Sequence, residues 1–196
     1  MKKSFFWAFL AIVFIGGGCV GGGEPQDIEE VASGIDRDSI LFEAQKNGLI
    51  MTDEEISAMT SGGVIVDESG ETPEIIERYL ETDVRGWASA ALADVTGGES
   101  FGIAHTQFES GLFTLISNMG NLPDPAEGYF YEGWLVRRGE SMSVISTGVA
   151  EKTAEGYVNV YTSKTDLSDH DFYVLTLEPN DEDPAPAEHI LEGTLR

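Results

Sequence analysis

The three histidines of this chain are the first residues to consider for chemistry, because imidazole both binds metal ions and transfers protons. They are His105, His170 and His189, and no two of them have the His-x-His or His-x-x-x-His spacing of a compact metal site. The only cysteine, Cys19, is distant in sequence from all three. We therefore predict no metal site and no cofactor, with a site assembled from distant histidines by folding as the alternative.

Motifs for catalysis are also missing from the sequence. It contains no Gly-x-Ser-x-Gly turn, no phosphate-binding loop and no His-Glu-x-x-His pair. The polar stretch around Asp166, Asp169, His170 and Asp171 could touch a metal weakly, but we interpret it as a solvated loop. Serine, histidine and aspartate occur in most proteins of this length, so their presence alone does not indicate a triad. We predict no catalytic residues and expect that the protein is not an enzyme.

The N-terminus has the features of an export signal. Lys2 and Lys3 precede an unbroken apolar run over residues 5–15, and three glycines then lead to Cys19. This arrangement resembles the lipobox of bacterial-type lipoproteins, in which the signal is cut before the cysteine and the thiol is lipidated. The resemblance implies a signal peptide over residues 1–18, lipidation at Cys19, and a body held at the outer face of the membrane.

Two alternatives to lipidation at Cys19 are an uncleaved signal anchor and ordinary secretion with a free thiol. The apolar stretch over residues 5–20 is shorter than the ~20 residues that span a bilayer, which disfavours the anchor. All three interpretations place the folded body outside the cytoplasm.

The chain is strongly acidic, with 35 Asp and Glu against 11 Lys and Arg and a net charge of −24. Nucleic acid needs a basic patch on its partner, so we predict no nucleic-acid binding. The same charge opposes lying flat on anionic lipid, which leaves Cys19 as the expected membrane attachment. The local acidic clusters lack the alternating ligands of a calcium loop, and we interpret the acidity as a means of solubility.

The sequence predicts a Gly-rich acidic linker over residues 19–38, and short helices follow it. Asn47-Gly48 is typical of a helix end, and Thr52 with Glu55 has the spacing of a capping box. Thr72-Pro73 is typical of a further helix start. We expect a helical extension over residues 39–83, with a brief extended run at residues 64–66.

The pattern changes after residue 84 to short runs rich in β-branched and aromatic residues, separated by Gly, Pro, Asn and Asp. Such runs, with no helical pattern between them, are typical of an antiparallel β-sandwich or Greek-key barrel. We therefore predict a mainly β domain of about eight strands over residues 84–196, preceded by the short helical extension. The expected strands are 87–95, 102–108, 111–118, 128–137, 143–149, 156–161, 171–178 and 189–195.

Several motifs of this β region occur in an order that suggests a family. A strand from Tyr129 to Val136 contains Trp134, and it is followed by the run Thr176-Leu177-Glu178-Pro179 and by a Pro-bearing loop before the last strand. This order resembles the C-terminal extracytoplasmic domain of RskA-type anti-sigma factors, over about Gly86 to Leu195. The resemblance implies a β-sandwich outside the membrane and a regulatory role with an envelope or membrane protein as partner. It does not imply direct sigma-factor binding.

Within this domain we predict three core residues, Trp134, Leu175 and Leu177, with Trp134 at the centre of the sandwich. The polar and aromatic residues of the longest strand are the candidates for binding contacts. They are Tyr129, Tyr131, Arg137 and Arg138. For the two arginines, surface ion pairs with neighbouring acids are the alternative.

Together these features favour a membrane-anchored extracytoplasmic lipoprotein whose β-sandwich binds or senses without catalysis, in anti-sigma or envelope-stress regulation. A structural or adhesion module of the envelope is the first alternative. A metal-binding sandwich of the cupredoxin or superoxide dismutase kind is the second.

Overall fold

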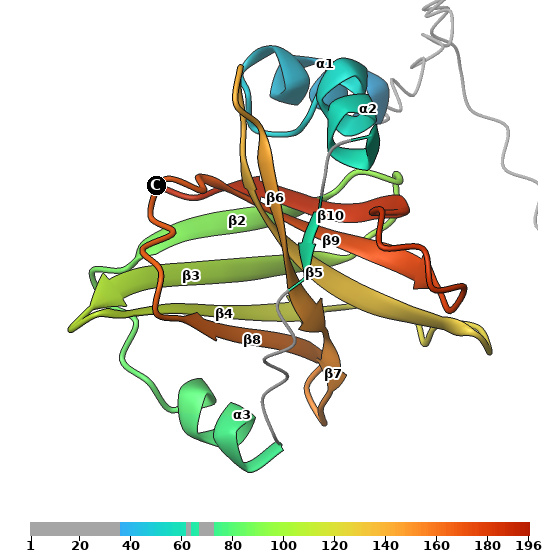
Figure 1. Ribbon diagram of the computed structural model, residues 1–196. Coiled ribbons are helices and arrows are strands. Elements are labelled where there is room, and N and C mark those ends of the chain that lie inside the picture. The colour runs from blue at the N-terminus through green and yellow to red at the C-terminus, as the bar shows by residue number, and fades with distance from the viewer. Residues whose placement is uncertain (1–35, 62–63, 67–72) are drawn as a thin grey trace, which may run out of the picture. The chain divides into compact units, whose positions relative to one another are not determined.

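The computed structural model describes residues 36–61, 64–66 and 73–196 (Figure 1). The predicted signal, the predicted lipidation site Cys19 and residues 19–35 of the predicted linker lie outside the described residues, whereas the last two residues of that linker, 37 and 38, belong to the first helix. Asp36–Arg196 form one compact unit, which contains both the helices and the β domain. Within the described part of the chain, no helix is long and apolar enough to span a bilayer.

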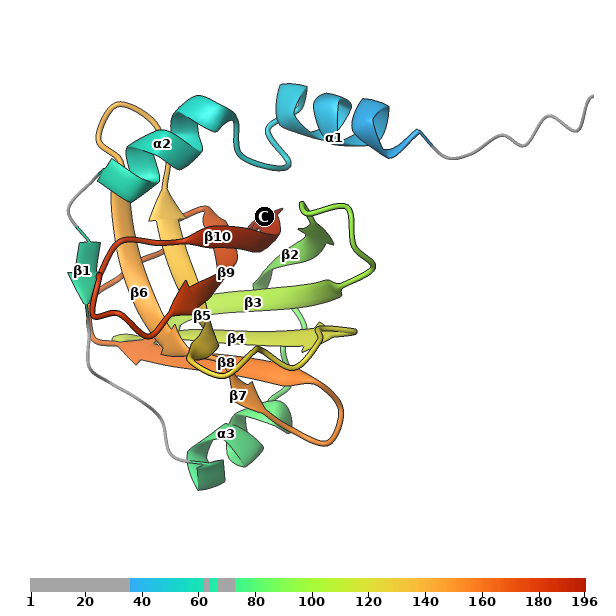
Figure 2. The same ribbon diagram turned by 90° about the vertical axis from the view of Figure 1, so that its right-hand side faces the viewer.

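A single ten-stranded sheet dominates this unit, in the order β1-β6-β5-β9-β10-β2-β3-β4-β8-β7. Strands β2 to β10 pair antiparallel, whereas the short β1 is parallel to β6. Strand β6 contacts β8 across the seam, so the sheet almost closes into a barrel (Figures 1 and 2). The strands are β1 Val64–Val66, β2 Ala88–Asp94, β3 Phe101–Glu109, β4 Leu112–Gly120, β5 Tyr129–Arg137, β6 Ser143–Val149, β7 Glu151–Lys152, β8 Tyr157–Ser163, β9 Phe172–Pro179 and β10 Glu188–Thr194.

This architecture confirms the predicted fold class, a mainly antiparallel barrel-like sheet of about eight strands with short helices before it. Each predicted strand is present within two residues of its expected ends. The short β7 was not predicted, since two residues carry no alternation of apolar and polar side chains.

Three helices precede the β domain: α1 Arg37–Lys46, α2 Asp53–Ser61 and α3 Pro73–Leu80. The predicted capping box at α2 is confirmed, because Thr52 N–H donates to Glu55 Oε2 at 2.9 Å and Glu55 N–H donates to Thr52 Oγ1 at 3.3 Å. Helix α1 ends at Lys46, with Asn47 as its C-cap. Gly48 follows with a φ of 66°, the left-handed conformation that glycine adopts readily.

The helices cover outward-facing apolar residues that the barrel interior cannot hold. Residues of α2 and the loop before it, including Met51 and Met59, pack with Trp134 and Val136 on the outer face of β5. Ile76 of α3 packs with an apolar cluster on β4 and β8. The two coverings lie at opposite ends of the barrel in Figure 1. Burial of these faces stabilises helices that are too short to persist alone.

Trp134 corrects one expectation about the core. Its side chain is buried, with 2% of its surface exposed, but it lies under α2 and not at the centre of the barrel. Its Nε1–H donates to Thr176 Oγ1 at 2.8 Å. Leu175 lies in the barrel interior as predicted, and the half-buried Leu177 packs against that interior cluster. Strand alternation explains the result, because Tyr131 and Leu135 of the same strand point inward.

A polar network crosses part of the barrel interior. The Ser117 hydroxyl donates to the Tyr173 hydroxyl at 3.0 Å, and the Tyr173 hydroxyl donates to Asn159 Oδ1 at 3.2 Å. Thr147 Oγ1 donates to the same Asn159 oxygen at 2.7 Å. Burial raises the pKa of Tyr173, so its hydroxyl keeps its proton and remains a donor. Gly133 leaves the space that these side chains fill.

Candidate functional site

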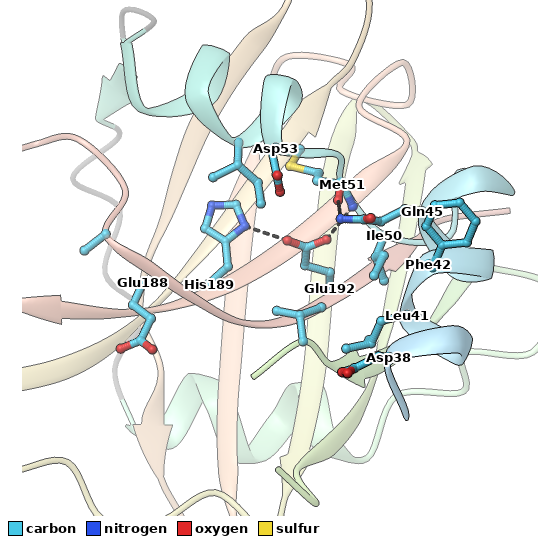
Figure 3. Close-up of a pocket in the computed structure, with 13 residues that line it drawn as sticks. Asp38, Leu41, Phe42, Gln45, Ile50, Met51, Asp53, Glu188, His189 and Glu192 are labelled. Carbon is cyan, nitrogen blue, oxygen red and sulfur yellow. Dashed lines mark hydrogen bonds and ion pairs between the residues drawn. The ribbon is translucent and has the colours of Figure 1, made fainter. Parts of the chain in front are cut away.

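A cavity of about 480 Å³ lies between helices α1 and α2 and the start of β10 (Figure 3). Its volume falls in the range of small-molecule sites. Its lining residues come from both helices, the loop that joins them, β10 with the residue before it, and the residue that follows β2. They are Asp38, Leu41, Phe42, Gln45, Ile50, Met51, Asp53, Ile56, Val95, Ala187, Glu188, His189 and Glu192.

Two buried ionisable side chains lie together in the wall of this cavity. His189 Nδ1 is 2.6 Å from Glu192 Oε1, and Glu192 Oε2 accepts a hydrogen bond from Met51 N–H at 2.6 Å. Only 7% of the surface of His189 and 1% of that of Glu192 is exposed. A carboxylate oxygen can only accept, so His189 Nδ1 is the donor in this pair.

The other ring nitrogen of His189, Nε2, is buried, and no hydrogen-bond partner for it is present among the described residues. In a neutral ring that donates from Nδ1, Nε2 is an acceptor. A buried acceptor without a donor costs free energy, and a ligand that brings an N–H or O–H group to it would recover that cost.

The rest of the lining combines apolar side chains with carboxylates. Ile50 and Met51 are buried, whereas Phe42 is exposed over 63% of its surface. Asp38 and Asp53 are exposed at the rim, and the lining contains no Lys or Arg. The cavity therefore favours an apolar molecule that is neutral or positively charged.

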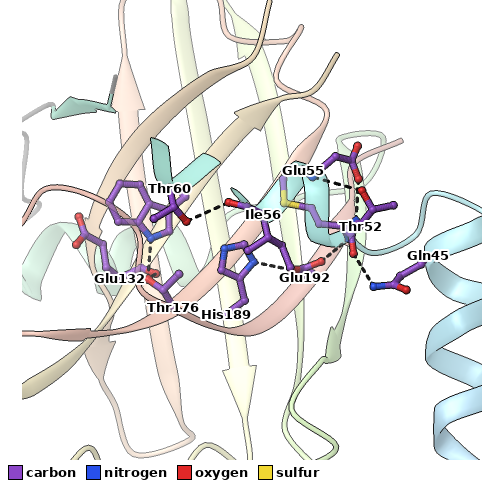
Figure 4. Close-up of polar contacts among 11 residues, drawn as sticks. Gln45, Thr52, Glu55, Ile56, Thr60, Glu132, Thr176, His189 and Glu192 are labelled. Carbon is purple, nitrogen blue, oxygen red and sulfur yellow. Dashed lines mark hydrogen bonds and ion pairs between the residues drawn. The ribbon is translucent and has the colours of Figure 1, made fainter. Parts of the chain in front are cut away.

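The loop between α1 and α2 is held by hydrogen bonds to α1 and to the barrel. Gln45 Nε2 donates to Met51 O at 3.1 Å, within the network that Figure 4 shows. Gly48 O accepts from Arg138 Nη1 at 3.1 Å and from Thr194 Oγ1 at 2.9 Å. These bonds position Met51 N–H for its contact with Glu192, so the cavity is preformed.

A β-bulge brings His189 and Glu192 to the same face. Residues three apart point to opposite faces of a regular strand, but the register of β10 against β9 shifts between His189 and Leu191. Sequence reasoning missed this pair for that reason. The only signal was a His and a Glu within one apolar strand, where charged residues are seldom buried unless paired.

The structure does not gather the four predicted binding residues into one site. Tyr129 is exposed, whereas Tyr131 is buried in the barrel, where its ring packs edge-on against Tyr157 at 5.1 Å. Arg137 Nη1 bonds Asp169 Oδ2 at 2.6 Å. Arg138 lies 3.6 Å from Asp171 Oδ2 and stacks over the Phe172 ring at 4.3 Å. Both arginines thus form the ion pairs that were the alternative to ligand binding.

The three histidines are in separate surroundings. Burial lowers the pKa of His105 on β3, and its Nδ1 has no hydrogen-bond partner among the described residues. Within the described chain, no three His, Cys, Asp or Glu side chains are grouped as a metal site. Searches of protein-family models, of curated proteins and of solved structures found no match to this chain.

Proposed function

We propose that the protein is a lipid-anchored extracytoplasmic binding protein. In this proposal a small organic cation, an ammonium group with a hydrocarbon part, binds in the cavity between α1, α2 and β10. The observation that carries this proposal is the buried Nε2 of His189, which has no hydrogen-bond partner in the described part of the chain and lies in the wall of a partly apolar cavity. Sensing at the membrane surface is the role that such binding would serve.

The charge of the lining supports a cation over an anion. Asp38 and Asp53 at the rim would attract an ammonium group, and their attraction is unopposed by any basic lining residue. His189 Nε2 would accept a hydrogen bond from an N–H group of the ligand. Ile50 and Ile56 would bury its hydrocarbon part, with about 25 cal/mol gained for each Å² of apolar surface removed from water.

The membrane attachment rests on the lipobox-like sequence at Cys19, and the regulatory setting rests on the resemblance to RskA-type outer domains. We expect Cys19→Ser to release the protein from the membrane fraction into the medium, because one or more acyl chains would be lost. Unchanged membrane association of this variant would reject lipidation at Cys19 as the anchor.

Titration with a matched pair of ligands tests the binding proposal. We expect hexylamine, which is a cation with N–H groups at neutral pH, to bind the purified domain in calorimetry, whereas hexanoate, with the same chain length and the opposite charge, does not. In NMR spectra the amide signals of Met51 and Glu192 should shift on binding, and those of the distant α3 should not. Equal response to amine and carboxylate would contradict the proposal.

A charge-matched control separates this site from the general attraction of an acidic protein for cations. Asp38→Asn with Asp53→Asn removes two charges at the rim, and Asp181→Asn with Asp183→Asn removes two from an exposed loop. We expect the first double variant to lose about tenfold in affinity and the second to change it little, since exposed distant charges are screened by salt. An equal loss in both would indicate nonspecific attraction and would favour the structural alternative, an envelope module without a ligand.

A further inference from the structure

A second cluster of chemically active side chains lies away from the cavity described above. Ser143 begins β6, and Asp169 and His170 end the loop that leads into β9. His170 Nε2 is 3.2 Å from Ser143 Oγ, and His170 Nδ1 is 2.8 Å from Asp169 Oδ1. Folding thus joins a hydroxyl, an imidazole and a carboxylate in a continuous chain of hydrogen bonds, although residues 143 and 169 are far apart in the sequence.

The carboxylate end of this chain sets the protonation of the imidazole. Asp169 Oδ2 accepts from Arg137 Nη1 at 2.6 Å, and this guanidinium, together with His170, holds the pKa of Asp169 below its usual value. An ionised Asp169 requires the proton of His170 to be on Nδ1. Nε2 is then an acceptor, and it faces the Ser143 hydroxyl as the base of a Ser-His-Asp triad does.

A cavity of about 330 Å³ opens onto this cluster. His170 is buried, with 5% of its surface exposed, whereas Ser143 is half-buried and lines the cavity. Ile145 and Leu167 provide apolar lining, and Ser163 and Thr165 add hydroxyl groups. The cavity can therefore hold a small acyl group beside Ser143.

We propose that Ser143 is a nucleophile for acyl transfer from small neutral esters, with His170 as general base and Asp169 as its positioning residue. Ser143 Oγ forms a bond to the ester carbonyl carbon as its proton passes to His170 Nε2. The carbon–oxygen bond of the ester then breaks, and the leaving alcohol takes that proton. Water hydrolyses the acyl-serine by the reverse proton transfers, which releases the acid and restores the serine.

This inference departs from the expectation that the protein is not an enzyme, and it is independent of the cation-binding proposal. The competing explanation is a structural one, in which the same hydrogen bonds only hold the loop between β8 and β9. The two explanations differ in one respect: a structural serine does not react with an electrophile, whereas a serine activated by a base does.

Labelling with a fluorophosphonate probe tests the proposal directly. Ser143 Oγ would attack phosphorus, fluoride would leave, and His170 would accept the serine proton. We expect one adduct per chain, mapped by mass spectrometry to Ser143. Ser168→Ala, which changes an exposed serine of the same loop that does not line the cavity, should retain the label, and Ser143→Ala should lose it.

His170→Gln separates activation from folding. If thermal unfolding shows that this variant is folded, we expect its rate of labelling at Ser143 to be lower than that of the wild type by about 100-fold or more. The rate of p-nitrophenyl acetate hydrolysis should fall with it. Labelling of Ser143 at an equal rate in the wild type and in folded His170→Gln would overturn the proposal. The absence of any label on Ser143 in the folded wild type would overturn it as well.

Discussion

His189 Nδ1 lies 2.6 Å from Glu192 Oε1 across a bulge of β10, and both side chains are almost fully buried beneath the helices. Burying a carboxylate is costly unless its oxygens are bonded. Here one oxygen faces His189 and the other accepts from Met51 N–H, so the pair connects the barrel to the loop between α1 and α2. This connection gives the cavity its wall and makes the helices part of the folded unit.

Glu192→Leu should therefore destabilise the protein strongly. It leaves Met51 N–H and His189 Nδ1 buried without an acceptor, and we expect the free energy of unfolding to fall by about 2–4 kcal/mol in urea titrations. Glu188→Leu makes the same chemical change at an exposed position of the same strand, and it should cost less than about 0.5 kcal/mol. Similar effects of the two variants would contradict this account.

Gly133→Ala should destabilise the barrel interior. A methyl group at this position would overlap Asn159 Oδ1, Thr147 Oγ1 and the Tyr173 hydroxyl. We expect a loss of about 3 kcal/mol in the free energy of unfolding, measured by chemical denaturation. Tyr173→Phe removes one of the three overlapping oxygens, so the double variant should cost less than the sum of the two single variants. Strict additivity would argue against the steric explanation.

Glu132→Gln should change how stability depends on pH. Burial raises the pKa of Glu132 above 4.5 and the nearby Glu178 adds to this, while the bond from Ser146 opposes it. The folded state then binds more protons than the unfolded state, so this residue lowers stability as the pH rises from about 4.5 through its folded pKa. Glutamine keeps an acceptor for Ser146 without the charge.

Denaturation at several pH values measures this effect of Glu132→Gln. We expect the variant to gain stability over the wild type at about pH 7.5 and to gain less at about pH 4. A gain that is the same at both pH values would indicate that ionisation of Glu132 is not responsible.

Arg138→Met should cost more than the same change at Arg85. Arg138 bonds Gly48 O, pairs with Asp171 and stacks on Phe172, so it links the helical segment to β5 and β9. We expect a loss of about 1–2 kcal/mol in thermal or urea unfolding. The pair of Arg85 with Asp83 is exposed, and its removal should leave stability nearly unchanged. Equal losses would mean that the link through Arg138 contributes little.

Local patterns were sufficient to predict the described elements of this protein other than the two-residue β7. Alternating apolar residues identify a strand because neighbouring side chains point to opposite faces, and the strand Ser143–Val149 has the bounds expected for it. The capping residues Thr52 and Glu55 mark the start of α2 because their hydrogen bonds join residues only three apart. The fold class followed from the spacing of such elements.

The same patterns could not show which side of the sheet is the interior. Trp134 has the alternation of a core residue, and it is indeed buried, but the face it occupies is closed by α2 and not by the opposite wall of the barrel. Both faces of β5 are covered, so alternation alone does not distinguish them.

Sequence alone determined that this is an acidic, mainly β chain with a few capped helices, because composition, alternation and capping are local properties. Only the tertiary structure decided where chemistry can occur. His189 reaches Glu192 through a bulge, and Ser143 reaches His170 through the closure of β6 toward β8 and the loop after it. Such contacts depend on register and on the path of the chain in space, which nearest-neighbour patterns do not encode.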